Sequence, residues 1–281
     1  SGHGTACAGL SAGKNFGLSF EANIWNMSAI ATPTGMSIEA SYDLMKIWHK
    51  NKPVNPSTGV KNPTVINGSW GYQGSIISST NTVFYDFRGS SGTFIANAPV
   101  TDQVTAMKEG LVSQIPGYYK TWSTWSGSNS NDTAGDELMS EGVIYVAAAG
   151  NNNQRLGVGA ADPDRLNTLN FLPCNHRDLM NPHGIGFDEV NDFHPVICVG
   201  AMDEYIENNL SERKASYSNN GPGIDVWAPA DETLSAGTNG LPVYTDYQRY
   251  DNSQFYDCLF NGTSAAAPVV TGLVALYLEN N

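Results

Sequence analysis

The chain has 281 residues, 41% of them hydrophobic and 15% charged, which is enough to bury a large core in one large or two ordinary domains. Its 14 basic residues against 27 acidic ones give a net charge of −13, and a field of that sign disfavours nucleic acid and anionic membrane surfaces as partners. The longest apolar run, residues 265–278, is too short to span a membrane.

The first half of the chain predicts helices and strands in alternation. In chain order we expect a short helix of small residues that begins near His3 and ends near Gly13, a strand over residues 22–27, a helix capped by Ser37 that runs to residue 50, and a strand over residues 64–71. Residues 80–87 predict an edge strand and residues 102–115 a helix, whereas residues 122–133 are rich in Ser, Asn and Gly and predict an exposed loop.

The second half resumes the alternation. Residues 134–141 predict the end of a helix, and buried strands are expected at residues 142–151, 195–201 and 224–229. Strands that alternate with helices in this way indicate an α/β fold with a parallel sheet.

The C-terminal stretch from Asn261 to Pro268 runs from a Gly-Thr-Ser turn into a small and apolar segment with no polar face, which predicts a helix buried on all sides. Pro268 is expected in the first helical turn, where a helix accepts proline without losing a needed N–H. Ser264 would then lie at the positive end of this helix, where it is either a nucleophile or simply the helix N-cap. Both interpretations remain open at this point.

Metal-binding motifs are weak in this sequence. The four cysteines form no CxxC pair; Cys7 and Cys198 predict buried free thiols, and a Cys174–Cys258 disulfide is left open. Two groups contain ligand-type residues, but such residues usually decorate exposed loops, so we expect no cofactor and no metal in the site, with a structural calcium as the alternative. The two groups are Cys174, His176, Asp178, His183, Asp188 and His194, and Asp162-Pro163-Asp164.

Three separate signals supply the roles that acyl transfer to water requires. His3 lies between Gly2 and Gly4 and can act as a general base, Ser264 can be the nucleophile, and the Asn151 amide at a strand tip can donate to an oxyanion.

The chain resembles the subtilisin-like serine proteases (subtilases). The matching stretches occur in the family's order and are Gly2-His3-Gly4-Thr5 with Ala8-Gly9, residues 65–71, residues 146–151, residues 195–201, residues 217–222 and Gly262-Thr263-Ser264-Ala265-Ala266-Ala267-Pro268. The resemblance implies a single domain over residues 1–281, built as a three-layer α/β sandwich with a central, mostly parallel sheet and with insertions near residues 72–133, 152–194 and 231–257. It implies a serine endopeptidase in which His3 is the base, Ser264 the nucleophile and Asn151 an oxyanion donor.

The resemblance also implies a binding cleft for a polypeptide substrate. Ser69, Trp70 and Gly71 would bind the substrate as an added strand, with Gly35 and Met36 on the other side. Ala147, Ala148 and Ala149 would form a wall of the pocket for the residue before the cut, and an apolar or aromatic side chain is expected there.

The sequence departs from the family at both ends. Subtilases carry a catalytic Asp upstream of the His, and only Ser1 and Gly2 precede His3 here. The family also continues beyond the serine helix, which ends near the last residue of this chain. We therefore expect the fold to be incomplete at both ends, with an Asp-bearing segment supplied by the same polypeptide or by a separate chain. Without that Asp, activity is expected to fall about ten-thousandfold.

Two functions follow. The first is an active endopeptidase with an extracellular or particle-associated location, and the second is a catalytically degenerate subtilase that serves as a structural or binding module in a larger assembly.

Overall fold

The structure is a computed structural model of the chain. It describes residues 2–15, 17–27, 36–70, 72–73, 82–87, 90–95, 129–151, 153, 168–169, 173–174, 196–203, 212–221, 223–237, 246–247 and 257–279.

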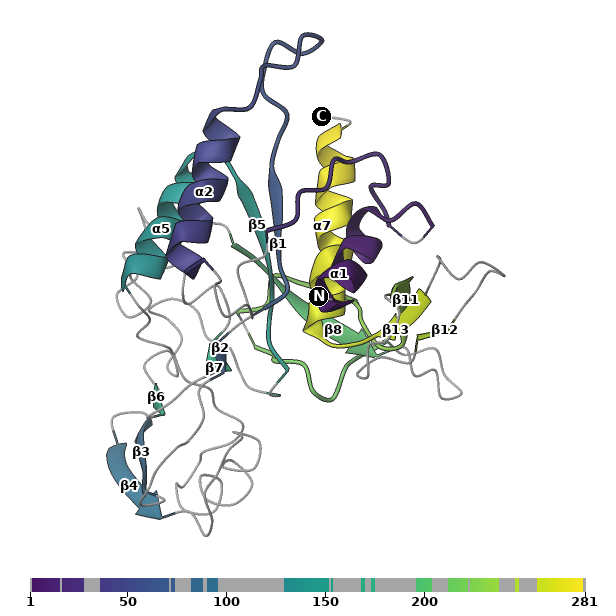
Figure 1. The fold of residues 1–281 in the computed structure, drawn as a ribbon. Helices are drawn as coiled ribbons and strands as arrows, with labels where there is room; N and C mark the ends of the chain where they lie inside the picture. Colours follow the sequence, from purple (N-terminus) through teal and green to yellow (C-terminus); the bar gives the residue numbers. More distant parts are fainter. Residues whose placement is uncertain are drawn as a thin grey trace.

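The centre of the fold is a parallel sheet whose described strands follow the order β1-β5-β8-β10 (Figure 1). These strands are β1 (Val65–Gly68), β5 (Ile144–Ala148), β8 (Val196–Asp203) and β10 (Val226–Pro229), and the short β9 (Arg213–Lys214) pairs antiparallel with the end of β8. The predicted strands at residues 64–71, 142–151, 195–201 and 224–229 are therefore confirmed.

Helices cover both faces of this sheet. Helices α1 (Gly2–Ala12) and α7 (Thr263–Glu279) pack on one face, and α2 (Ile38–Lys50) and α5 (Asn129–Ser140) pack on the other (Figure 1). Successive side chains of a strand point to opposite faces, and β5 uses this alternation. Tyr145 and Ala147 join the α2/α5 core, whereas Val146 and Ala148 join the α1/α7 core. The predicted three-layer α/β sandwich is confirmed.

Helices α1 and α7 pack closely because the residues between them are small. A Cβ on Gly272 would stand 2.5 Å from the Ser11 carbonyl oxygen, so this position of α7 accepts only glycine without a shift. Ser11 also donates from Oγ to the Pro268 carbonyl oxygen at 3.1 Å. The buried alanines at residues 265–267 complete the contact with the sheet.

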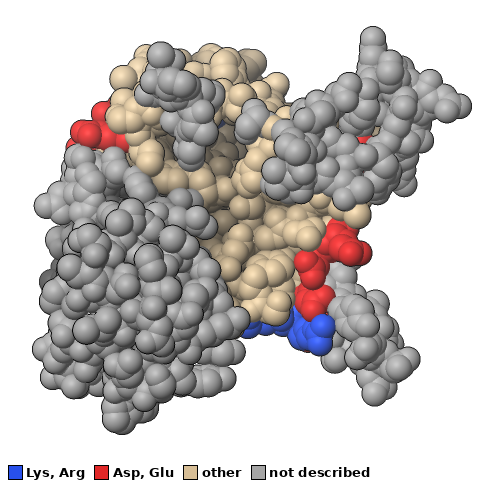
Figure 2. All heavy atoms as spheres, turned by 60° about the horizontal axis from the view of Figure 1, so that its bottom comes forward, with Lys and Arg blue, Asp and Glu red and all other residues tan. Residues whose placement is uncertain are grey.

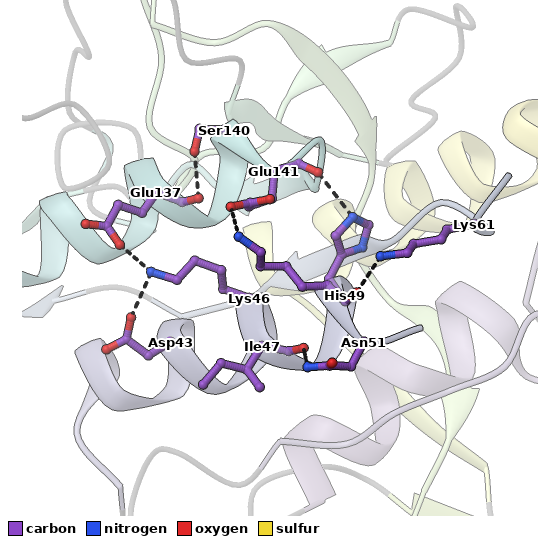
Figure 3. A network of polar contacts seen from close by, with 10 residues as sticks. Asp43, Lys46, Ile47, His49, Asn51, Lys61, Glu137, Ser140 and Glu141 are labelled. Carbon is purple, nitrogen blue, oxygen red and sulfur yellow. Dashed lines mark hydrogen bonds and ion pairs between the residues drawn. The ribbon is translucent and has the colours of Figure 1, made fainter. Parts of the chain in front are cut away.

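Helices α2 and α5 are joined by charged side chains at the surface (Figure 3). Lys46 pairs with Glu137 of α5 and, at 3.2 Å, with Asp43, and Lys50 pairs with Glu141 at 2.7 Å. The predicted cap of α2 is confirmed, because Ser37 Oγ accepts from the Ala40 backbone N–H at 3.1 Å.

Smaller antiparallel sheets complete the described structure. They are β11-β13-β12, β4-β3-β6 and β2-β7. Their strands are β2 (Tyr72–Gln73), β3 (Thr82–Phe87), β4 (Ser90–Ile95), β6 (Thr168–Leu169), β7 (Pro173–Cys174), β11 (Thr233–Ala236), β12 (Asp246–Tyr247) and β13 (Asp257–Phe260).

Three sequence-based expectations about elements are wrong. Residues 22–27 form no strand, and Trp25 instead packs against Trp48 of α2, with ring centroids 4.9 Å apart and ring planes tilted by 53°. Strand β3 is central in its sheet rather than at an edge, because it pairs with both β4 and β6. Helix α5 begins at Asn129, so the loop expected up to residue 133 is too long.

Other expectations are not tested. The helix expected at residues 102–115 lies outside the described residues, and the insertions and the single-domain assignment stay predictions. No helix in the described part of the chain is both long and apolar enough to cross a membrane.

Candidate active site

Ser264 is the second residue of α7, at the end where the parallel strands finish. The helix starts after Gly262, which has a φ of 94° and whose carbonyl accepts from the Ala265 backbone N–H at 2.8 Å. Gly262 therefore occupies the N-cap position, and the alternative that Ser264 is merely the N-cap is wrong. Figure 2 shows the face at the lower end of Figure 1, where the described surface is mostly uncharged and is hollowed at its centre.

The Ser264 hydroxyl is held by Ser69, which follows β1 directly. Ser264 Oγ donates to the Ser69 carbonyl oxygen at 3.2 Å, and Ser69 Oγ donates to the Ser264 carbonyl oxygen at 2.9 Å. Ser69 is buried. Two reciprocal hydrogen bonds therefore join the start of α7 to the end of β1.

Pro268 lies deeper in α7 than the sequence suggested. It is the sixth residue of a helix that begins at Thr263, so the expectation that it lies in the first turn is wrong. The N–H that proline lacks would normally bond to the carbonyl four residues earlier. That carbonyl belongs to Ser264.

Asn151 lies beside the start of α7, just beyond the end of β5. The Thr263 backbone N–H and Thr263 Oγ1 both donate to Asn151 Oδ1, at 2.9 and 2.8 Å. Because a backbone N–H can only donate, the atom that faces it is the amide oxygen, and Nδ2 points the other way. Asn151 is exposed, so Nδ2 can donate to a substrate. The Ser264 backbone N–H also has no acceptor among the described residues.

His3 lies on α1 with its ring edge-on to Phe260, and the ring centroids are 5.2 Å apart. Its Nδ1 is 3.8 Å from Cys7 Sγ, one turn along the helix, and Cys7 Sγ donates to the Ser264 carbonyl oxygen at 3.6 Å. Burial lowers the pKa of His3 and favours the neutral ring at neutral pH. Across the described ranges, no hydrogen bond joins His3 to Ser264 and no carboxylate is paired with His3.

The Cys7 thiol faces Nδ1 of His3, and which of the two donates depends on the tautomer of the ring. Burial raises the pKa of Cys7 to about 11, so the sulfur keeps its single proton at neutral pH. When Cys7 donates this proton to the Ser264 carbonyl oxygen, the sulfur can only accept from His3. Nδ1 of His3 then carries the ring proton and donates to the sulfur. Nε2 is then left with a free lone pair. A neutral sulfur can thus orient the His3 ring, but it adds no negative charge beside the ring, as a carboxylate would.

The expected substrate-binding residues are only partly described. Ser69 contacts Ser264, and Trp70 lies on the α2 side with its ring 6.5 Å from that of Tyr42. Met36 is exposed, whereas Gly35 and Gly71 lie outside the described residues. Ala147, Ala148 and Ala149 are all buried, so their role as a pocket wall stays a prediction.

The ligand-type residues named in the sequence lie mainly in segments that the structure does not describe, so the expectation of no metal in the site stays a prediction. Within the described ranges, no group of three or more His, Cys, Asp and Glu side chains gathers. The two ligand-type groups at residues 162–164 and 174–194, including the Cys174 side chain, fall outside. Cys7 and Cys198 are buried as predicted, and Cys258 Sγ donates to the Ala236 carbonyl oxygen at 3.4 Å.

The sequence analysis missed Asn67, Cys7 and Thr263 as parts of this site. Thr263 holds Asn151 and also accepts from the Gly150 backbone N–H at 3.0 Å. Pro268 was one signal, because a proline four residues after a helical serine removes the N–H that the serine carbonyl would accept from, but it does not say which residue replaces that donor. Cys7 had a signal only in its spacing of four from His3.

Known proteins resemble this chain. The family model described as the subtilase family matches residues 1–281. Subtilisin DY of Bacillus licheniformis is 30% identical over 154 residues, which are 55% of this chain and 39% of that protein. The extracellular protease of Xanthomonas campestris pv. campestris is 29% identical over 187 residues, 63% of this chain and 24% of that protein. The chain spans less than half the length of these relatives.

Solved structures share the fold. A cold adapted subtilisin-like serine proteinase aligns with a TM-score of 0.52 at 19% identity, over 100% of this chain and 62% of that one. Fervidolysin from Fervidobacterium pennivorans, a keratinolytic enzyme related to subtilisin, aligns with a TM-score of 0.52 at 20% identity, over 99% of this chain and 30% of that one. These likenesses confirm the subtilisin-like fold.

Proposed function

Because the chain belongs to the subtilase family, we propose that it is a serine endopeptidase that hydrolyses peptide bonds through an acyl-enzyme. One observation carries the proposal. The hydroxyl of Ser264, its backbone N–H, which has no acceptor among the described residues, and the exposed Asn151 lie at the N-terminus of α7. His3 contacts Cys7, whose thiol donates to the Ser264 carbonyl. A nucleophile, a base and two oxyanion donors are the parts that acyl transfer requires.

The reaction would begin with a rotation of the Ser264 side chain, because its hydroxyl now donates to the Ser69 carbonyl. Oγ would then give its proton to Nε2 of His3 and attack the peptide carbonyl carbon. The Ser264 backbone N–H and Asn151 Nδ2 would hold the negative oxygen that forms. His3 would pass the proton to the leaving amine, and water would release the acyl group by the same steps in reverse order.

We also propose that an Asp-bearing segment, in the same polypeptide or as a separate chain, completes the site. The Cys7 sulfur can accept from His3 Nδ1, but it is neutral and does not stabilise a protonated ring. A carboxylate in that place would raise the pKa of His3 and stabilise the imidazolium that forms in the reaction. This would restore about ten-thousandfold in turnover.

The substrate is proposed to be a polypeptide bound in extended form beside Ser69, Trp70 and Gly71, with Gly35 and Met36 opposite. An extracellular or particle-associated location is proposed, and the relative named as an extracellular protease supports the first of these. An apolar or aromatic side chain before the cut is proposed because the described surface of this face is mostly uncharged (Figure 2).

The test is hydrolysis of an unfolded protein substrate by the protein purified from its native source, with Ser264→Ala as the control. Cleavage that is lost in the control supports the endopeptidase. An intact mass above 30.1 kDa, or a second chain that copurifies, would be consistent with the proposed Asp-bearing segment. Equal cleavage by both forms would contradict the role of Ser264. No cleavage by the native material would favour the degenerate module instead.

A further inference from the structure

The backbone carbonyl of Ser264 lacks its usual helical partner. In an α-helix each carbonyl accepts from the N–H four residues later. Four residues after Ser264 stands Pro268, which has no N–H. A carbonyl that is partly shielded from water and lacks a donor costs free energy, so a hydrogen bond from another group stabilises it.

Two side chains from other elements face this oxygen. Ser69 Oγ, at the end of β1, donates to it at 2.9 Å, and Cys7 Sγ, on α1, donates at 3.6 Å. The distance and the donor make the hydroxyl the stronger of the two bonds, because a thiol is a weak donor. The first turn of α7 is thereby tied to both neighbouring elements through a single atom.

The Ser69 hydroxyl is itself oriented by Asn67 of β1. Asn67 Nδ2 donates to Ser69 Oγ at 2.9 Å, and Thr271 Oγ1 of α7 lies 3.2 Å from Asn67 Oδ1. A hydroxyl has one proton, and the Ser264 carbonyl at 2.9 Å is nearer to Ser69 Oγ than Asn67 Oδ1 at 3.3 Å. A directed chain therefore runs from the Asn67 amide through the Ser69 hydroxyl to the carbonyl of Ser264.

We propose that Ser69 is a positioning residue whose hydroxyl replaces the N–H that Pro268 lacks and so fixes the backbone of Ser264 against the end of β1. The inference rests on the proposed function of Ser264. It gives the Ser69 side chain a role of its own, in addition to the proposed binding of substrate by the Ser69 backbone. Because Pro268 has no N–H, the Ser264 carbonyl is available to accept from Ser69. This hydrogen bond holds the Ser264 hydroxyl and backbone N–H in place.

The experiment is a double-mutant cycle of Ser69→Ala and Pro268→Ala in the native-length protein. The readout is the second-order rate at which a fluorophosphonate labels Ser264. With Pro268 in place, Ser69→Ala is expected to slow labelling at least about tenfold, because small misplacements of a nucleophile cost one to two orders of magnitude. In the Pro268→Ala background the backbone N–H that the replacement introduces can bond the carbonyl, and Ser69→Ala is expected to cost less than about threefold.

Two further variants separate positioning from general destabilisation. Ser69→Thr keeps the hydroxyl and is expected to restore most of the rate. Ser11→Ala removes a similar hydroxyl bond, the one from Ser11 Oγ to the Pro268 carbonyl at 3.1 Å, and is expected to leave the labelling rate nearly unchanged. Equal slowing by Ser69→Ala in both backgrounds would overturn the proposal, as would failure of Ser69→Thr to restore the rate.

The same cycle can be followed by urea unfolding, which needs no reactivity. If the unmodified protein is not labelled at all, the proposed function fails, while the hydrogen bond is still tested. Non-additive unfolding free energies for the two replacements would support the bond between Ser69 and the Ser264 carbonyl. Additive values would overturn it.

Discussion

The two helical layers of this molecule are held to the sheet by different chemistry. Helices α1 and α7 meet through small residues, with Gly272 against the Ser11 backbone, and through part-buried hydrogen bonds from α1 side chains to α7 carbonyls. Helices α2 and α5 meet through Tyr42, Leu138 and their neighbours and through exposed ion pairs (Figure 3). In the first layer Gly272 leaves no space for a Cβ, whereas in the second layer the paired side chains are partly exposed to solvent. The candidate nucleophile lies in the first layer.

The largest effect is expected at Asn151, the proposed oxyanion donor beside the start of α7. Asn151→Ala removes an oxyanion donor and should lower turnover about a hundred- to thousandfold, the magnitude known for the oxyanion asparagine of subtilisin, or about 3–4 kcal/mol in activation free energy. Asn151→Asp keeps the oxygen that accepts from Thr263 but has no donor, so it should lose turnover with less effect on unfolding. Asn51→Ala, at the end of α2, is the matched control. Turnover retained in both Asn151 variants would remove this residue from the reaction.

The second-largest effect is expected where α7 packs closely on α1. Gly272→Ala places a methyl group against the Ser11 carbonyl and should lower the free energy of unfolding by about 2 kcal/mol. Leu44→Ala, at an exposed position of α2, should cost less than about 1 kcal/mol. Urea denaturation measures both. Similar costs in the two helices would show that the layers do not differ in the way described.

The two layers also each contain a histidine whose pKa is lowered by burial. Only the neutral His3 ring can accept the Ser264 proton, so the labelling rate should rise with pH and level off. In the 281-residue chain without the proposed Asp-bearing segment, its half-maximum should lie below about 6.5, the ordinary value for histidine. His49→Gln should leave this profile unchanged. A half-maximum clearly above that value would mean that a negative charge faces His3.

The smallest effect is expected at the ion pairs of α2 and α5. Lys46→Met removes the contacts with Asp43 and Glu137 but keeps the aliphatic part of the side chain. Exposed pairs contribute little, so the free energy of unfolding should change by less than about 1 kcal/mol. Added salt should reduce the difference further. A loss above about 2 kcal/mol would show that this layer depends on its charges.

Local patterns were sufficient for the elements that the core depends on. The small-residue helix after His3, the buried strands and the apolar C-terminal helix each follow from composition and period. The prediction of a strand at residues 22–27 was wrong because an alternating pattern does not supply a partner strand. Trp25 packs against Trp48 of α2 instead.

The candidate site was predictable only in part. His3, Asn151 and Ser264 were named from motifs at strand ends and helix starts. The pair of hydrogen bonds between Ser69 and Ser264 could not be predicted, because the two residues are 195 positions apart and come together only through tertiary packing. Pro268 was visible in the sequence, but its consequence depends on where the helix begins.

The most direct test of the account is the position of a fluorophosphonate adduct on the native protein, mapped by peptide mass spectrometry. The account predicts one adduct, on Ser264, that is absent in Ser264→Ala and forms more slowly in His3→Ala. An adduct on another serine that persists in Ser264→Ala, or no adduct under conditions that label a known subtilisin, would contradict it.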